Sequence, residues 1–207
     1  MTLRIQPRRP AHCGAALLHA CQYACFLSGI VLLAYAAAVW LDACLYQRNE
    51  ARAFEETKGR SCIPDHSAPL IRHAVLGKID IPEVGVSAMI AEGDDPRTLK
   101  RAVGHISGTA LPGDPGNVVL AAHRDTFFRP LRKIQRGDAI LLTTWSGSYR
   151  YRVESIRVVG PNDVGVLRPT SQPELTLVTC YPFYFVGSAP KRFVVRAGLG
   201  CALTKTK

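Results

Sequence analysis

The segment TLVTCYPF, residues 176–183, joins a β-branched apolar run to a cysteine and a turn-forming proline. Threonine, valine and leucine favour a pleated, buried strand, and the Tyr-Pro step after Cys180 favours its end. A strand end holds a sulfur in a fixed place, while the following loop leaves it open to a substrate. The segment therefore predicts a β domain with Cys180 at a strand end as a candidate nucleophile.

Two further reactive residues stand at predicted strand ends. His123 follows the apolar run 118–122, and Arg192 precedes the apolar run 193–195. A free thiol has a pKa of about 8.5, so it needs a nearby cation or base to react at neutral pH. His123 can take the thiol proton and later protonate a leaving amine. Arg192 stays charged and suits holding a carbonyl oxygen or an oxyanion, so the three residues indicate acyl transfer on a peptide bond.

Short apolar runs separated by turn residues continue from Val75 onward, a spacing typical of β-barrels and sandwiches. Residues 94–101 combine an acidic start, a proline and a basic end, which predicts a short helix. The result is a small, mainly antiparallel β domain with one or two short helices. Predicted strands are residues 77–81, 84–90, 118–122, 139–144, 148–158, 175–179 and 192–196.

The N-terminal part contains a segment suited to crossing a membrane. Residues 14–41 include no Asp, Glu, Lys or Arg. At about 1.5 Å per residue they exceed the roughly 30 Å hydrocarbon layer. The rival interpretation, a cleaved signal peptide, has an apolar region of only about 7–15 residues. Arg4, Arg8 and Arg9 precede the span without an acidic residue among them, which favours an internal N-terminus and an external β domain.

These features predict a linear organisation in five parts. They are an N-terminal cytoplasmic tail (1–13), a transmembrane anchor (14–41), a stalk or linker (42–74), a catalytic domain (75–200) and a C-terminal tail (201–207). The pattern to Lys58 is compatible with a continuation of the anchor helix. The net charge of +10 is scattered without a clustered, aromatic-interleaved face, so no nucleic-acid partner is expected. A solvated basic surface near anionic lipid or cell-wall polymer fits better.

Seven cysteines do not form a recognisable disulfide framework. Cys13, Cys21, Cys25 and Cys44 lie in or beside the predicted span, where packing accounts for them. Cys62 and Cys201 fall near the two ends of the external part and could pair in an oxidising compartment, although the sequence does not require it. Cys180 alone has a context that explains a free thiol.

The three candidate residues lie in motifs that resemble those of the sortase family. Residues 176–183 are similar to the family's active-site motif, and VLAAHRD, residues 119–125, to its histidine block. Arg192 falls where sortases have an essential arginine. The resemblance covers roughly residues 75–199 and includes GHI at 104–106, GTALPG at 108–113 and GN at 116–117. The CYPF run and the short loop to Arg192 look most like class D sortases.

This resemblance implies a sortase-like closed β-barrel of about eight strands after an N-terminal transmembrane helix. It implies a membrane-anchored cysteine transpeptidase that cleaves an LPXTG-like C-terminal sorting motif of secreted proteins through a thioacyl intermediate. The acceptor would be an amine of a cell-wall precursor or a pilin lysine. Cys180 would be the nucleophile, His123 the general acid/base and Arg192 the oxyanion or substrate-positioning group, with no cofactor or metal. The expected location is the bacterial cytoplasmic (inner) membrane, single-pass, with the catalytic domain outside.

Secondary expectations concern residues around this site. Thr179 is a candidate for helping the oxyanion site, with an ordinary strand role equally open. Residues 161–174 match a loop that forms part of the peptide groove in sortases, which suggests an apolar wall of Val164, Val166 and Leu167. His105 is expected to be structural. Arg124 and Asp125 are expected to support the loop after the histidine.

Other functions fit the sequence less well. A papain-like hydrolase places cysteine before histidine and uses an asparagine, and an L,D-transpeptidase has a Ser-x-Gly-Cys type signature that is absent. A zinc site from His105, His123 and Cys180 lacks a close ligand pair. A non-enzymatic surface module on the same barrel would be expected to lack a catalytic residue, and substitution of Cys180 separates it from an enzyme.

Overall fold

The structure is a computed structural model that describes residues 13–58 and 73–205, with side chains for residues 17–56 and 73–200. The predicted tail before residue 13, residues 59–72 of the predicted stalk, and the proposed Cys62–Cys201 pair fall outside this description. The chain divides into two compact units, residues 1–42 and residues 43–207.

Helix α1 spans Cys13–Lys58 and contains the whole predicted anchor. Its apolar side chains in the first unit, such as Leu33, Tyr35 and Trp40, are exposed. A helix that exposes apolar residues all round is stable where lipid replaces water. Among the described residues, α1 is long and apolar enough to cross a membrane, which is compatible with a single-pass anchor.

The C-terminal part of α1 belongs to the second unit and packs on the β domain. The Gln47 side chain accepts a hydrogen bond from the Met89 amide at 2.8 Å and donates one to the Arg101 carbonyl at 2.6 Å. Phe54 is buried, with its ring centroid 4.4 Å from that of Trp145. The second unit therefore begins within this helix, before the first strand.

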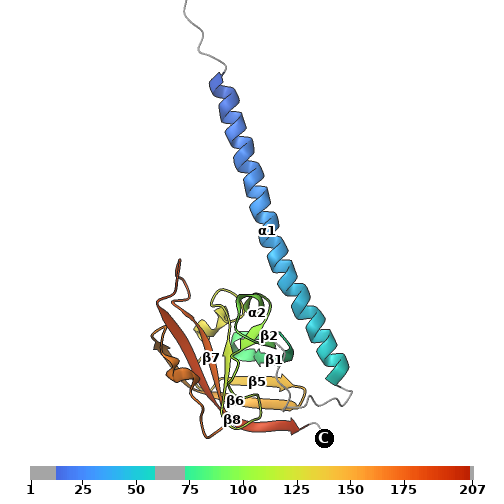
Figure 1. The fold of residues 1–207 in the computed structure, drawn as a ribbon, viewed down its shortest axis with the longest axis vertical. Helices are drawn as coiled ribbons and strands as arrows, with labels where there is room; N and C mark the ends of the chain where they lie inside the picture. The colour runs from blue at the N-terminus through green and yellow to red at the C-terminus, as the bar shows by residue number, and fades with distance from the viewer. Residues whose placement is uncertain (1–12, 59–72, 206–207) are drawn as a thin grey trace, which may run out of the picture. The chain divides into compact units, whose positions relative to one another are not determined.

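Eight strands form a closed barrel in the order β1-β2-β3-β4-β7-β8-β6-β5 (Figure 1). Pairs β2–β3 and β4–β7 are parallel, and the other six are antiparallel. Closure leaves no unpaired sheet edge. The predicted fold class is confirmed. The strands are β1 (Val75–Ile81), β2 (Val86–Glu92), β3 (Val103–His105), β4 (Asn117–Ala121), β5 (Ala139–Thr144), β6 (Gly147–Val159), β7 (Glu174–Tyr181) and β8 (Lys191–Lys205).

Short helices fill the connections. They are α2 (Pro96–Arg101) and the 3-10 turns η1 (Pro82–Val84), η2 (Arg129–Lys133) and η3 (Val164–Leu167). Asp95 caps α2 by accepting hydrogen bonds from the Arg97 and Thr98 amides at 2.9 and 3.3 Å. Pro96 occupies a first-turn position, where a missing N–H costs little. The short helix expected at residues 94–101 is thus present, with its first two residues outside the helical turn.

Of the seven predicted strands, only β5 has the expected bounds, and three of the differences from expectation have a clear reason or extent. The second strand begins at Val86 because Pro82–Val84 form η1, which ends at Gly85 with a φ of 73°. Strand β3 was not predicted, since three residues carry no readable alternation. Strand β8 continues to Lys205, past the boundary expected at residue 200.

Alternation along β4, β7 and β8 separates an inner from an outer face. The inner residues join the hydrophobic core, and they include Leu120 on β4, Leu177 on β7 and Val195 on β8. The outer residues are Asn117, Val119 and Ala121 on β4, Thr176, Val178 and Cys180 on β7, and Arg192, Val194 and Arg196 on β8. We refer to these nine residues as the outer face.

Candidate active site

Cys180 and Arg192 are direct partners across the antiparallel β7–β8 ladder. Residues that face each other in such a pair have Cβ atoms about 4.5–5.5 Å apart on the same side of the sheet. Both side chains are half-buried on the outer face. The pairing therefore starts the two side chains from neighbouring positions on the same side of the sheet, and both remain partly accessible.

His123 reaches the same end of the outer face from β4. Strands β4 and β7 are parallel, with Ala121 opposite Val178, so their carboxyl ends coincide. The contact continues beyond the ladder, because the Ala122 amide donates to the Val178 carbonyl at 3.3 Å. Ala122 packs into the core, and alternation turns the next residue, His123, outward. His123 and Cys180 thus lie at corresponding positions, each two residues beyond the Ala121–Val178 pair.

A tight turn after His123 holds its backbone. The carbonyl of His123 accepts hydrogen bonds from the amides of Thr126 and Phe128 at 3.4 and 3.3 Å. Phe128 is fully buried in the core. Phe128, a buried aromatic five residues after His123, thus anchors the segment that carries the imidazole.

Arg124 joins the histidine segment to the loop between Cys180 and Arg192. Its guanidinium donates to the carbonyls of Pro182, Phe185 and Gly187 at 3.1, 2.8 and 3.0 Å. A planar guanidinium with several N–H groups suits three carbonyls held in one loop. The sequence indicated a supporting role for the histidine loop. The geometry shows that Arg124 holds the β7–β8 loop.

The Arg192 guanidinium is already oriented in this structure. Its Nη1 donates to the carbonyls of Ala189 and Lys191 at 3.2 and 3.1 Å. Both bonds use one nitrogen of a group with five N–H donors. The remaining donors of the fork suit a substrate carbonyl or oxyanion.

An aromatic cluster beside Cys180 and Arg192 was not predicted from the sequence. Tyr181, Phe183 and Phe193 pack together, with centroid separations of 6.0, 6.2 and 5.2 Å. Phe193 and Tyr181 flank Arg192 and Cys180 along their strands and point to the other face. The aromatic residues of the CYPF run were the sequence signal for this cluster, because aromatic side chains close together on strands tend to pack against one another.

Thr179 is buried, and its hydroxyl donates to the carbonyl of Ala122 at 2.7 Å. Alternation places this side chain on the opposite face from Cys180. The hydroxyl therefore ties β7 to the residue that precedes His123, and it does not point to the sulfur side of the strand.

The three expected groove residues lie together on η3. Val164 is exposed, while Val166 and Leu167 are half-buried. They form one turn of the loop that joins β6 to β7, directly before the strand that carries Cys180.

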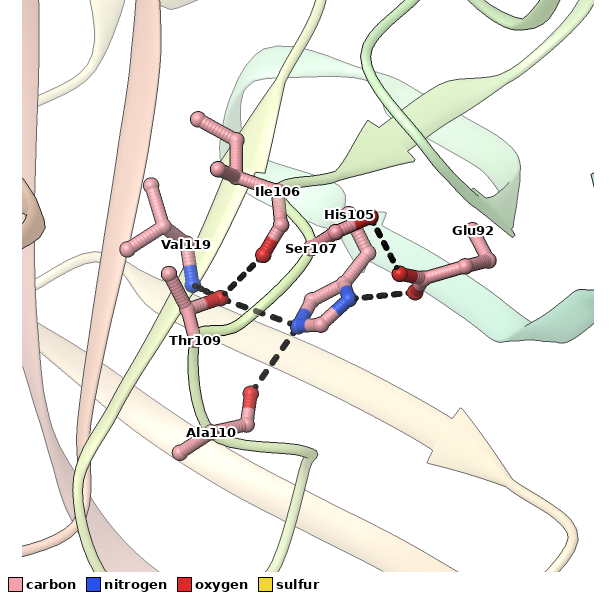
Figure 2. Close-up of polar contacts among 7 residues, drawn as sticks. All are labelled: Glu92, His105, Ile106, Ser107, Thr109, Ala110 and Val119. Atoms are coloured by element: carbon pink, nitrogen blue, oxygen red, sulfur yellow. Dashed lines mark hydrogen bonds and ion pairs between the residues drawn. The ribbon is translucent and has the colours of Figure 1, made fainter. Parts of the chain in front are cut away.

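His105 does not lie with Cys180, His123 and Arg192 but in a separate buried cluster (Figure 2). Its Nδ1 is 2.6 Å from Glu92 Oε2, and its Nε2 is 3.0 Å from both the Ala110 carbonyl and Thr109 Oγ1. The Thr109 hydroxyl donates to the Ile106 carbonyl, so both groups near Nε2 act as acceptors. Nε2 therefore carries a hydrogen.

Glu92 completes this cluster by accepting a hydrogen bond from Ser107 Oγ at 2.6 Å. Burial alone would raise the pKa of Glu92, but the hydrogen bonds from His105 and Ser107 and the charge of His105 outweigh it and lower that pKa. With Glu92 as a carboxylate, which only accepts, His105 Nδ1 is the donor in the 2.6 Å contact. Among the described residues, His, Cys, Asp and Glu side chains form no group of three that could hold a metal ion.

A closed barrel with cysteine, histidine and arginine at the same end of three adjacent strands has groups suited to acyl transfer. A sortase-domain family model matches residues 79–200, and Bacillus subtilis Sortase D is 35% identical over 120 residues, 58% of this chain. The chain belongs to the sortase family. The match spans 61% of the length of the Bacillus protein.

Solved structures agree with this assignment. A Clostridium perfringens Sortase D5 transpeptidase is 29% identical, with a TM-score of 0.64 over 77% of this chain and 99% of that chain. Listeria monocytogenes sortase A is 30% identical, with a TM-score of 0.58 over 64% of this chain and 92% of that chain. Class D proteins occur in both the sequence and the structure comparisons, as the CYPF run suggested.

Proposed function

We propose that this protein is a membrane-anchored cysteine transpeptidase acting on secreted proteins with an LPXTG-like sorting motif. The observation that carries the proposal is the register of three strands, in which Cys180 faces Arg192 on β8 and His123 extends the parallel neighbour β4. Nucleophile, base and oxyanion donor are the groups that acyl transfer requires.

In the first half-reaction the Cys180 sulfur attacks the carbonyl carbon of the scissile peptide bond. His123 either takes the thiol proton or already pairs with the thiolate as an imidazolium. The Arg192 guanidinium stabilises the oxyanion of the tetrahedral intermediate. When the C–N bond breaks, His123 gives its proton to the departing amine, and a thioester to Cys180 remains.

In the second half-reaction an acceptor amine attacks the thioester carbonyl. His123 takes a proton from the attacking nitrogen, Arg192 again holds the oxyanion, and the C–S bond breaks. The sulfur recovers its proton, and a new amide is released. An amine of a cell-wall precursor or of a pilin subunit has the required chemistry.

The proposed setting is the bacterial cytoplasmic membrane, crossed once by α1, with the barrel outside. The apolar, uncharged part of α1 and the basic residues before it support this arrangement. The loop that carries Val164, Val166 and Leu167 is proposed as a wall of the peptide groove. It enters β7 six residues before Cys180.

The decisive experiment uses the full chain in detergent with a fluorogenic LPXTG peptide and an oligoglycine acceptor. The wild type should release the fluorophore, form the transfer product and give a peptide thioester on Cys180 that mass spectrometry detects. Cys180→Ala should lose all three signals and keep its melting temperature. Cys44→Ala, which removes a described thiol on α1, should retain them. Full turnover after complete alkylation of Cys180 would refute the assignment, and binding without cleavage would favour a surface module.

A further inference from the structure

Asn117 is a buried polar residue at the opposite end of the outer face from the catalytic residues. It is the first residue of β4, and His123 lies three alternation steps further along the same side. Only 2% of its surface is exposed. A buried amide requires hydrogen-bond partners, and those of Asn117 show what it does.

The Asn117 side chain reaches across to η3. Its Nδ2 donates to the Val166 carbonyl at 2.9 Å and to the Arg168 carbonyl at 3.2 Å. Its Oδ1 accepts from the Thr176 hydroxyl at 2.7 Å, and Thr176 is fully buried on β7. Backbone carbonyls only accept hydrogen bonds, so the NH₂ group must face the loop, and Thr176 keeps it there.

These two bonds hold the segment that joins β6 to β7. Among the described residues, the other hydrogen bonds of residues 161–172 stay within the β6–β7 connection, such as Asp163 N–H to the Gly160 carbonyl at 3.3 Å, and the next tie to the barrel is at Pro173, whose carbonyl accepts from Leu199 N–H at 3.3 Å. The segment's remaining hydrogen bonds are internal, such as Gly165 N–H to Asp163 Oδ1 at 3.0 Å. A surface connection of this length is mobile unless it is tied to the scaffold.

The tie is made to the two strands that carry the chemistry. Asn117 and Thr176 belong to β4 and β7, and the ladder between these strands continues to the Ala121–Val178 pair beside the catalytic end. Val119 is fully buried on this face, and Val178 is half-buried. A rigid, mostly apolar strip therefore connects the tether at one end with His123 and Cys180 at the other.

We propose that Asn117, oriented by Thr176, is a positioning residue that fixes the η3 wall of the peptide groove relative to Cys180. The inference rests on the proposed function, since it assigns η3 to substrate binding. Asn117 acts through Val166 and Arg168 and does not touch the reacting atoms. Its loss weakens peptide binding and leaves the chemical step intact.

The test compares Asn117→Asp, Asn117→Ala and Thr176→Val in the full chain in detergent. Asn117→Asp keeps the shape of the side chain but turns an acceptor toward two carbonyls. Thr176→Val keeps the amide and removes the hydroxyl that orients it. The matched control is Thr170→Val, because Thr170 donates to the Gln172 carbonyl within the same loop and does not tie it to the barrel.

Three readouts are required: amide hydrogen exchange across residues 160–173, KM and kcat with the sorting peptide, and the rate of Cys180 alkylation by iodoacetamide. Both Asn117 variants should raise the rate of amide exchange in the loop. They should also raise KM about tenfold, which is the scale of losing one or two net hydrogen bonds. Their kcat and alkylation rates should stay within about twofold of wild type. Thr176→Val should move in the same direction by less, and Thr170→Val should match wild type.

Unchanged loop exchange in both Asn117 variants would overturn the proposal, as would a fall in kcat at constant KM. If an Asn117 variant does not fold, Thr176→Val decides by the same two criteria. If the wild type cleaves no sorting peptide, the proposed function fails. The exchange data then still decide whether Asn117 holds the loop.

Discussion

Arg192 shows how one side chain acquires its role from its cross-strand partner. An arginine at the start of a strand is ordinarily an exposed base, and its pairing with Cys180 across the ladder is what makes Arg192 a candidate for the site. Its Nη1 is held by two carbonyls of its own loop, which orients the fork before substrate arrives. Oriented donors stabilise charge without reorganisation during the reaction.

We predict that Arg192→Lys lowers kcat for peptide cleavage by about 10²–10³ while the melting temperature stays near that of wild type. Lysine keeps the charge but offers a compact ammonium in place of the planar fork. Steady-state kinetics and thermal melts measure the two effects. Arg196→Lys is the matched control, since Arg196 lies on the same face of β8 and pairs with Glu174 at 3.4 Å. Near-normal turnover in Arg192→Lys would remove it from the mechanism, and a large fall in melting temperature would make it structural.

At the scale of elements, the buried Glu92–His105 pair holds the connection from β3 to β4 through hydrogen bonds. His105, the last residue of β3, bonds to Glu92 on one side and to Thr109 and Ala110 on the other. Thr109 Oγ1 also accepts from the Val119 amide at 3.3 Å. The cluster thus links β2, β3 and β4, and it holds the connection that leads into the strand ending near His123.

Stability should therefore depend on the ionisation of Glu92. Its folded pKa lies below the ordinary value of 4.5, so its contribution is full above that value and is lost as the pH falls through the folded pKa. Glu92→Gln should lower the melting temperature at pH 7, and the difference from wild type should shrink below about pH 4. Thermal melts between about pH 3 and 7 measure this. The exposed Glu154→Gln is the control, and a constant difference across the range would contradict the assignment.

At the scale of the whole molecule, α1 changes in character along its length. The first part of α1 is uncharged and exposes apolar side chains, whereas Gln47 and Phe54 near its end contact the β domain. The first part suits a lipid environment because its exposed side chains are apolar. The last part suits contact with protein because its partly buried polar group has hydrogen-bond partners there. The apolar part of α1 and the part that packs on the β domain thus belong to one helix, Cys13–Lys58.

We predict an external β domain with the N-terminus inside. Protease added to intact spheroplasts should release a fragment that carries residues 75–200, while a cytoplasmic marker protein stays intact. The physical reason is the basic N-terminal flank of the span, which disfavours translocation. Protection of the domain until the membrane is lysed would contradict this topology.

Local patterns in the chain were sufficient for much of this description. Seven of the eight strands and α2 could be located, because alternation, capping and turn residues act over a few neighbouring positions. Cys180, His123 and Arg192 were recognisable as candidates because each stands where an apolar run begins or ends. The uncharged length of residues 14–41 indicated the anchor in the same way.

Tertiary structure alone decided how these parts meet. Three-residue β3 has too few positions for a pattern, and it exists because β2 and β4 supply its partners. Arg124 contacts carbonyls 58 to 63 residues away, and Asn117 contacts a loop 49 to 51 residues away. Such contacts depend on strand register and barrel closure, which many distant residues determine together. The candidate residues were therefore recognisable in the sequence, and the contacts that position them became visible only in the folded barrel.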